Sequence, residues 1–241
     1  VIIGDRRKYP FEQSFVICRT VAEVASAIEG MVTQGSGPWL ASVNALRILT
    51  FNSPANPAVL MSDLLLARNL LVRTRPTNTA MTQRLDQMLG VAKDVLATNG
   101  DVDTAIAASI EATLLGIYDG YTLRALAMAD LINDGDGILT NCFGEAGVLL
   151  SFAFARKQGK DITVYAPETR PYFQGAKLTA PSLHEMGIQV NLITDNMPAH
   201  IMSEGKIQKY ITAADLITLD GHVVNKIGTF QNAISAHAHD I

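Results

Sequence analysis

Three side chains in the second half of the chain could do chemistry, and each follows a predicted strand. They are the thiol of Cys142, the carboxyl group of Asp215 and the amine of Lys226. In open α/β sheets, ligands bind beyond the carboxyl ends of the strands. The spacing therefore predicts a single pocket that holds these three groups, and we interpret the chain as an enzyme. The polar stretches that surround the pocket are residues 139–142, 167–171, 213–215 and 225–229.

Cys142 lies between a predicted strand, residues 138–140, and a predicted helix, residues 145–157. The positive end of that helix could stabilise a thiolate, which indicates a reactive cysteine. The alternative is a buried structural cysteine, because a lone thiol commonly packs as a small apolar side chain.

Asp215 follows the predicted strand 209–212, and the small residues Ala213 and Ala214 precede it. A buried carboxyl group at this position could act as an acid or a base once burial raises its pKa. The alternative is an aspartate that caps a turn, a common use of this residue after a strand.

Two further stretches suit an anionic group such as phosphate. Asn225 and Lys226 open the last predicted helix, where free N–H groups, the helix dipole and an ammonium would act together. Arg75 precedes a predicted helix in the first half, and its planar guanidinium can bind phosphate through two hydrogen bonds. The alternatives are an ordinary capped helix with an exposed lysine, and a solvated surface arginine.

Composition argues against several other classes of protein. With a net charge of -4 and scattered basic residues, the chain lacks the polycation that nucleic-acid binding needs. The strongest apolar stretch, residues 146–155, is shorter than the ~20 residues that cross a bilayer. Two cysteines and no zinc-like His/Cys spacing predict neither a disulfide scaffold nor a metal site, and a reducing cytoplasm is the expected location. Residues 35–37 lack the spacing of an ATP or dinucleotide loop.

The order of the predicted elements divides the chain in two. Residues 1–133 read as a mainly helical domain, and a polar, glycine-rich stretch at 133–137 marks the boundary. Residues 134–241 alternate strands with helices, which predicts a Rossmann-like, doubly wound parallel sheet in an α/β fold. The helices are expected at 21–31, 39–48, 58–72, 80–97, 102–132, 145–157, 174–186, 197–204 and from about 225, and the strands at 138–140, 162–165, 190–193 and 209–212. The last helix is expected to be still running at Ile241, so the native C-terminus could lie further on.

The polar stretches around Cys142, Asp215 and Lys226, in this order along the chain, resemble the methylthioribose-1-phosphate isomerase family. Relatives of that family include ribose-1,5-bisphosphate isomerase and the regulatory subunits of translation initiation factor 2B. The resemblance covers nearly the whole chain and is densest at residues 165–171, 174–179 and 192–197. It implies a helical N-terminal domain, a Rossmann-like C-terminal domain, a homodimer, no cofactor and a role in methionine salvage.

The resemblance also implies roles for individual residues. The catalytic cysteine and aspartate of the family fall on Cys142 and Asp215, which would handle protons. The implied substrate-binding residues are Gly35, Arg75, Gln174, Asn225 and Lys226. The implied reaction converts 5-methylthioribose 1-phosphate, or a close 5-deoxy pentose 1-phosphate, into the open ribulose 1-phosphate form. Hydrogen would move from C2 to C1 as a proton or as a hydride.

The chain departs from the family pattern at four positions near these residues. Gln34 stands where the isomerases carry the arginine of a phosphate loop, and an amide supplies neither its charge nor its two-pronged geometry. Asn141, Phe143 and Ala213 replace a histidine, an asparagine and a glycine. Because the thiol and the carboxyl group remain, we favour a divergent sugar-phosphate isomerase. The alternative is a non-catalytic regulatory subunit of the initiation-factor type that binds a phosphorylated ligand.

Overall fold

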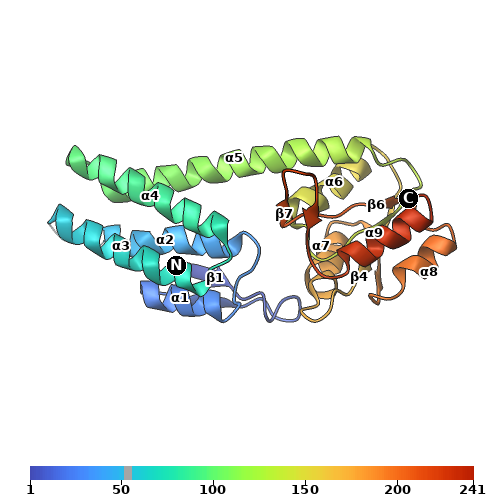
Figure 1. The fold of residues 1–241 in the computed structure, drawn as a ribbon, viewed down its shortest axis with the longest axis horizontal. Coiled ribbons are helices and arrows are strands. Elements are labelled where there is room, and N and C mark those ends of the chain that lie inside the picture. The colour runs from blue at the N-terminus through green and yellow to red at the C-terminus, as the bar shows by residue number, and fades with distance from the viewer. Residues whose placement is uncertain (52–55) are drawn as a thin grey trace. The chain divides into compact units, whose positions relative to one another are not determined.

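The computed structural model describes residues 1–51 and 56–241 of the chain. These residues form two compact units, residues 1–116 and residues 117–241, which divide inside one long helix (Figure 1). The domain boundary at residue 133 stays a prediction. The elements of the first unit are β1 (Ile2–Gly4), β2 (Phe15–Ile17), α1 (Val21–Glu29), α2 (Gly37–Phe51), α3 (Pro57–Thr74), α4 (Thr79–Ala97) and α5 (Val102–Asp130), the last of which continues into the second unit.

The first unit is helical, as the sequence predicts, and local signals explain where its helices begin. Thr20 and Glu23 form a capping box at the start of α1, and the side chain of Asn78 accepts a hydrogen bond from the Met81 N–H at the start of α4. Each helix contributes fully buried side chains to the core, including Ile28, Leu46, Leu64, Leu85 and Ile106. The sequence did not predict the short antiparallel pair β1–β2, which packs beside these helices.

The second unit contains a four-stranded parallel sheet in the order β5-β4-β3-β6. This arrangement confirms the predicted α/β fold. Its elements are β3 (Gly137–Leu139), α6 (Glu145–Lys157), β4 (Thr163–Pro167), the π-helix η1 (Gly175–Thr179), α7 (Ala180–Glu185), β5 (Gln189–Ile193), α8 (Pro198–Ser203), β6 (Lys209–Tyr210), β7 (Leu216–Ile217), β8 (Val223–Val224) and α9 (Thr229–Ala238).

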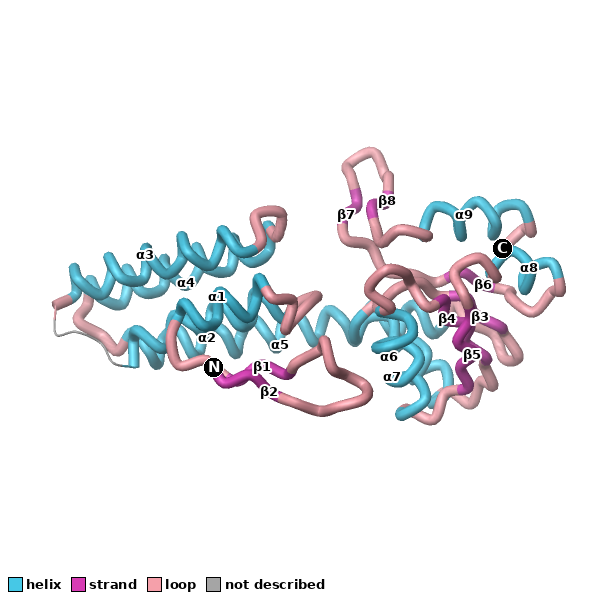
Figure 2. Tube along the Cα trace, turned by 90° about the horizontal axis from the view of Figure 1, so that it is seen from below, coloured by secondary structure: helices cyan, strands magenta, loops and turns pink. Residues whose placement is uncertain are grey.

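Helices cover both faces of this sheet, because successive strand residues point to opposite sides. Ile138 packs with the end of α5, with α6 and with α7, whereas its neighbour Leu139 packs with α8 and α9. Figure 2 shows α6 and α7 on one side of the strands and α8 and α9 on the other. The sheet is therefore doubly wound.

The strand order sets where a ligand would bind. From β3 the chain proceeds to β4 and β5 on one side of the sheet, and β6 then pairs with β3 on the other side. Ligands of doubly wound sheets bind at such a reversal, beyond the carboxyl ends of the two strands. Here those ends are followed by Cys142 and by the segment 211–215.

Three predicted elements differ from the structure. The strand expected at 209–212 ends at Tyr210. The single helix expected at 174–186 is a π-helix followed by α7, because Pro181 has no N–H with which to continue regular α-helical hydrogen bonding. The helix expected from about 225 to beyond 241 spans only Thr229–Ala238, since Gly228 just before it has a left-handed φ of 95°.

A hairpin between β6 and α9 was not predicted from the sequence. Strands β7 and β8 pair antiparallel, and Gly221, with φ 88°, lies in the turn between them. Figure 2 shows this hairpin extending away from the sheet. It carries exposed apolar side chains, which are Leu216, Ile217, Leu219, Val223 and Val224.

Candidate active site

Cys142 lies in the loop between β3 and α6, where both of its main-chain polar groups are held by threonine side chains. Its N–H donates to Thr169 Oγ1 at 3.1 Å, and its carbonyl accepts from Thr179 Oγ1 at 2.5 Å. Both threonines are almost fully buried. The backbone of Cys142 is left-handed, with φ 62°. The position of this residue is therefore fixed from two directions.

The environment of Cys142 favours the neutral thiol over the predicted thiolate. Burial raises the pKa of the thiol, while the Phe143 N–H and the charge of Lys226 lower it and the charge of Asp215 raises it. Burial is the largest of these effects and outweighs the polar groups at the start of α6. A neutral thiol suits the donation of a proton.

Lys226 and Asp215 both lie close enough to Cys142 for their charges to act on its thiol. The Nζ atom of Lys226 lies 5.7 Å from the centre of the Tyr172 ring, a cation–π contact. Asp215 is exposed, and the expectation of a buried carboxyl group is wrong. The reason is the hairpin: the Asp215 N–H donates to the Val224 carbonyl, so Asp215 lies at the base of the hairpin and outside the core.

Side-chain amides connect the Cys142 loop to the start of α9. The Nδ2 atom of the buried Asn141 donates to Thr229 Oγ1 at 2.9 Å, and Nδ2 of Asn225 donates to the same oxygen and to Thr212 Oγ1 at 3.1 Å each. This network holds the ends of β3 and β6 against α9. Asn225 and Lys226 precede α9 by several residues, so the prediction that they open the helix is wrong.

Gln174 immediately precedes η1 and is buried, and its Oε1 atom has no hydrogen-bond partner among the residues that the structure describes. A buried amide oxygen normally has a donor, so this atom is available to one from a ligand. Close packing fixes the next residue, because a Cβ added at Gly175 would lie 1.7 Å from the Pro167 carbonyl oxygen.

The two remaining predicted residues, Gly35 and Arg75, belong to the first unit. The other predicted site residues belong to the second unit and are Cys142, Gln174, Asp215, Asn225 and Lys226. Gly35 is left-handed, with φ 64°, in the loop before α2. The guanidinium of Arg75 contacts the sulfur of Met31. The guanidinium of Arg6 donates to the carbonyl of Gln34 at 3.1 Å. A cation thus lies at this loop although residue 34 itself is neutral.

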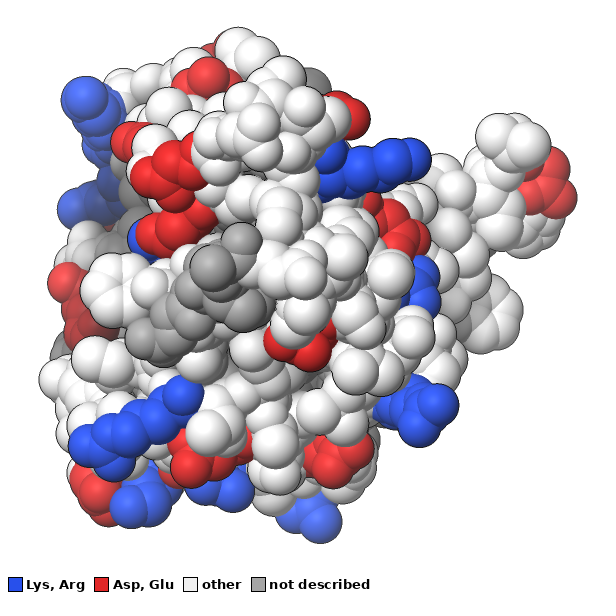
Figure 3. All heavy atoms as spheres, turned by 90° about the vertical axis from the view of Figure 1, so that its left-hand side faces the viewer, with Lys and Arg blue, Asp and Glu red and all other residues white. Residues whose placement is uncertain are grey.

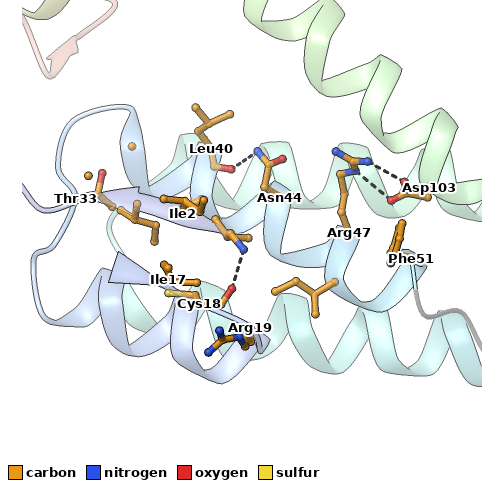
Figure 4. A pocket seen from close by; sticks show the side chains of 16 residues that line it. Ile2, Ile17, Cys18, Arg19, Thr33, Leu40, Asn44, Arg47, Phe51 and Asp103 are labelled. Atoms are coloured by element: carbon orange, nitrogen blue, oxygen red, sulfur yellow. Dashed lines mark hydrogen bonds and ion pairs between the residues drawn. The ribbon is translucent and has the colours of Figure 1, made fainter. Parts of the chain in front are cut away.

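The first unit also contains a pocket of about 800 Å³ between β1, β2 and α2 (Figure 4). Figure 4 shows Arg47 turned toward Asp103, and their ion pair is 2.8 Å long. The guanidinium is thus held at the pocket wall by a carboxylate. None of the residues predicted to bind substrate or to act in catalysis lines this pocket.

In the described part of the chain, no group of three or more His, Cys, Asp or Glu residues could hold a metal ion, and both cysteines are free. No helix within residues 1–51 and 56–241 has the length and apolar character needed to cross a membrane. On the face shown in Figure 3, basic and acidic side chains are interspersed, without a continuous basic surface.

Comparison with known proteins gives consistent results. The sequence profile of the Initiation factor 2 subunit family matches residues 40–241. Methylthioribose-1-phosphate isomerase from Petrotoga mobilis is 36% identical over an alignment that covers 100% of this chain and 72% of the relative. The crystal structure of 5-methylthioribose 1-phosphate isomerase from Pyrococcus horikoshii OT3 has a TM-score of 0.85 and 27% identity, with 100% of this chain and 70% of that chain covered. Translation initiation factor eIF-2B, subunit delta, from A. fulgidus has a TM-score of 0.84 and 30% identity, with coverage of 100% and 73%.

Proposed function

This chain belongs to the Initiation factor 2 subunit family, and we propose that it is a sugar-phosphate isomerase acting on 5-methylthioribose 1-phosphate or a close 5-deoxy pentose 1-phosphate. The names of its isomerase relatives support this activity. The observation that carries the proposal is the thiol of Cys142 at the reversal of strand order, within the electrostatic influence of Asp215 and Lys226.

The proposed chemistry begins with ring opening, because a phosphate on C1 blocks the spontaneous opening that free sugars undergo. The neutral thiol of Cys142 donates its proton to the ring oxygen as the bond from C1 to that oxygen breaks. The hydrogen on C2 then moves to C1, either as a proton carried by Asp215 or directly as a hydride. The proton of the C2 hydroxyl group leaves as the ketone forms, and it restores the thiol. No net hydrogen is gained or lost.

We assign the binding of the substrate to residues of the second unit near Cys142. Lys226, Asn225 and Gln174 supply an ammonium and two amides near Cys142. For the first unit by itself, we propose that Gly35 and Arg75 offer a backbone N–H and a guanidinium to an anionic group. A ligand held by several such donors would be fixed in one orientation before the hydrogen moves.

We add Arg6 to the proposed donors of the first unit because of Gln34. The 3.1 Å hydrogen bond from Arg6 to the Gln34 carbonyl places a guanidinium at the loop whose family arginine is absent. Arg6→Ala should raise the KM for the sugar phosphate, because a charged donor would be lost. Arg7→Ala is the matched control, since the Arg7 side chain instead pairs with Asp5.

We also propose a cytoplasmic homodimer that needs no cofactor. Exposed apolar side chains on the β7–β8 hairpin and on α9, among them Leu219 and Phe230, offer surface for association. Sedimentation of the protein with Leu219→Ser and Phe230→Ser would test whether this surface joins two copies.

The decisive experiment is the turnover of 5-methylthioribose 1-phosphate, 5-deoxyribose 1-phosphate and ribose 1,5-bisphosphate. Cys142→Ser and Asp215→Asn should each lower turnover by at least about a hundredfold, as expected for loss of an acid or a base. Cys18→Ser is the control, because Cys18 is a buried thiol of the first unit. A loss of less than tenfold in both variants would contradict the assigned roles.

A regulatory role is the second candidate, and the 30% identity to subunit delta of eIF-2B from A. fulgidus favours it. In that case the chain would bind a sugar phosphate saturably but turn over none of the three substrates. Cys142→Ser would then leave the affinity for the ligand unchanged.

A further inference from the structure

The loop that carries Cys142 is held by residues that the proposed reaction does not use. The Cys142 N–H donates to the side chain of Thr169 and the Cys142 carbonyl accepts from the side chain of Thr179, so both main-chain groups are held by side-chain hydroxyls. Left-handed backbone is rare for a residue with a side chain and persists only where the surroundings impose it. The two threonine hydroxyls are the groups that impose it here.

Hydrogen bonds fix both the hydroxyl and the backbone of Thr169. Its hydroxyl donates to the Pro167 carbonyl at 3.2 Å, which leaves the oxygen lone pairs to accept the Cys142 N–H. Its N–H and that of Arg170 donate to the two carboxylate oxygens of Asp195, at 2.7 Å each. Asp195 follows β5, so three neighbouring strand ends, those of β5, β4 and β3, are linked in sequence.

Thr179 is fixed by the π-helix. It is the last residue of η1, and the first residue of η1, Gly175, packs directly on the Pro167 carbonyl. The hydroxyl of Thr179 donates to the Cys142 carbonyl, so the register of η1 sets where that carbonyl points. A regular α-helix in this segment would move Thr179 around the helix axis and away from that carbonyl.

We propose that Thr169, Thr179 and Asp195 are positioning residues that set the backbone of Cys142 and thereby aim its thiol at the substrate. They act through Cys142 and need no contact with the sugar phosphate. The assignment rests on the proposed function for its catalytic meaning, but the geometry of the thiol can be measured without any turnover.

The test uses the full chain with Cys18→Ser, so that Cys142 is the sole thiol. Thr169→Val and Thr179→Val keep the side-chain shape and remove the hydroxyl, whereas Thr169→Ser and Thr179→Ser keep the hydroxyl. Thr74→Val is the matched control, because Thr74 is a buried, hydrogen-bonded threonine of the first unit. Two quantities are measured: the rate of alkylation of Cys142 by iodoacetamide as a function of pH, and kcat and KM for 5-methylthioribose 1-phosphate.

We expect both valine variants to expose the thiol, which shifts the midpoint of the alkylation profile to lower pH and speeds the reaction. Their kcat should fall about tenfold or more, with KM changed less than about threefold, since misplacement affects the chemical step more than binding. The serine variants and Thr74→Val should match the parent in both quantities. Asp195→Asn, which keeps one acceptor oxygen, should change both in the same direction by less.

An alkylation profile and a kcat unchanged in both valine variants would overturn the proposal. Urea unfolding of each variant separates loss of the whole fold from loss of position, and Asp195→Asn provides the milder perturbation if a valine variant does not fold. If the parent protein turns over no sugar phosphate, the proposed isomerase activity fails. The alkylation profiles still decide whether these three residues position Cys142.

Discussion

Gly175→Ala should destabilise the second unit more than any ordinary surface change. The added methyl carbon would lie 1.7 Å from the Pro167 carbonyl oxygen, 2.9 Å from the Pro167 carbonyl carbon and 3.0 Å from Thr169 Oγ1. Favourable contact between non-bonded atoms begins near ~3.5 Å, so η1 must move by well over ~1 Å. The atoms it meets are mostly backbone at the end of a central strand, which cannot rotate away.

The cost follows from what this movement breaks. Overpacking in a well-packed core costs about 1–3 kcal/mol. The movement also weakens the hydrogen bonds from the Ala176 N–H to the Glu168 carbonyl and from Thr179 to the Cys142 carbonyl, each contributing about 1 kcal/mol. We therefore expect Gly175→Ala to lower the free energy of unfolding by about 3 kcal/mol.

Urea unfolding followed by far-ultraviolet circular dichroism measures this loss. With a slope of about 2–3 kcal/mol per M, the midpoint should fall by roughly 1 M. Gly90→Ala is the control, because Gly90 lies inside α4 with open space around the added carbon and alanine favours a helix by about 1 kcal/mol. If Gly175→Ala loses less than about 1 kcal/mol, the π-helix does not pack on β4 as described.

Three further predictions concern charges and ionisation. The charges of Asp215 and Lys226 shift the pKa of the Cys142 thiol in opposite directions. Asp215→Asn should therefore lower the pH at which iodoacetamide alkylates Cys142 at half its maximal rate, and Lys226→Met should raise it. If both variants have the same pH profile as the parent protein, the two charges lie too far from the thiol to act on it. Burial, together with Glu145, raises the pKa of Tyr121 to about 12, so the free energy of unfolding should fall as pH rises from about 10 to about 12. Alkaline denaturation should show a smaller fall in Tyr121→Phe, and an unchanged fall would contradict the contribution of Tyr121. Arg47 holds the pKa of Asp103 below its usual range, so this carboxylate stabilises the fold above pH ~4. That stability is lost as the pH falls through the lowered pKa. Asp103→Asn should therefore flatten the acid dependence of the free energy of unfolding, and an unchanged acid titration of unfolding would refute the assignment.

Much of the architecture could be predicted because it depends on local patterns. Helical periodicity predicted the helices of the first unit, and α6 spans the predicted residues 145–157. The strands β1, β2, β7 and β8 were missed because segments of two or three residues have no detectable period. The π-helix was missed although Pro181 was visible, since a proline within a helical pattern does not say whether the helix kinks, ends or widens.

The candidate site was predictable only in part. Cys142 and Asp215 follow predicted strands, and the ends of parallel strands meet at a known edge of the sheet. Asn225 and Lys226 were predicted to open a helix, and in the structure they follow β8 of the antiparallel hairpin. The threonines that hold Cys142 could not be found this way, because their role depends on contacts between segments 27 and 37 residues apart. Whether the thiol is charged was likewise beyond the sequence, since burial competes with the start of α6 and only the structure shows which is larger.

Lys226 and Asp215 shift the pKa of the Cys142 thiol in opposite directions, so a substrate that binds Lys226 would change this pKa. In the free protein the charge of Lys226 lowers the pKa of Cys142 and so partly offsets burial. If Lys226 holds the phosphate of the substrate, as proposed, two negative charges cancel its influence, and enclosure by the substrate adds to the burial of the thiol. Both changes favour the protonated form. The substrate would thus bring its own proton donor into the state that ring opening requires, which explains why a lysine can lie near a cysteine that must stay neutral.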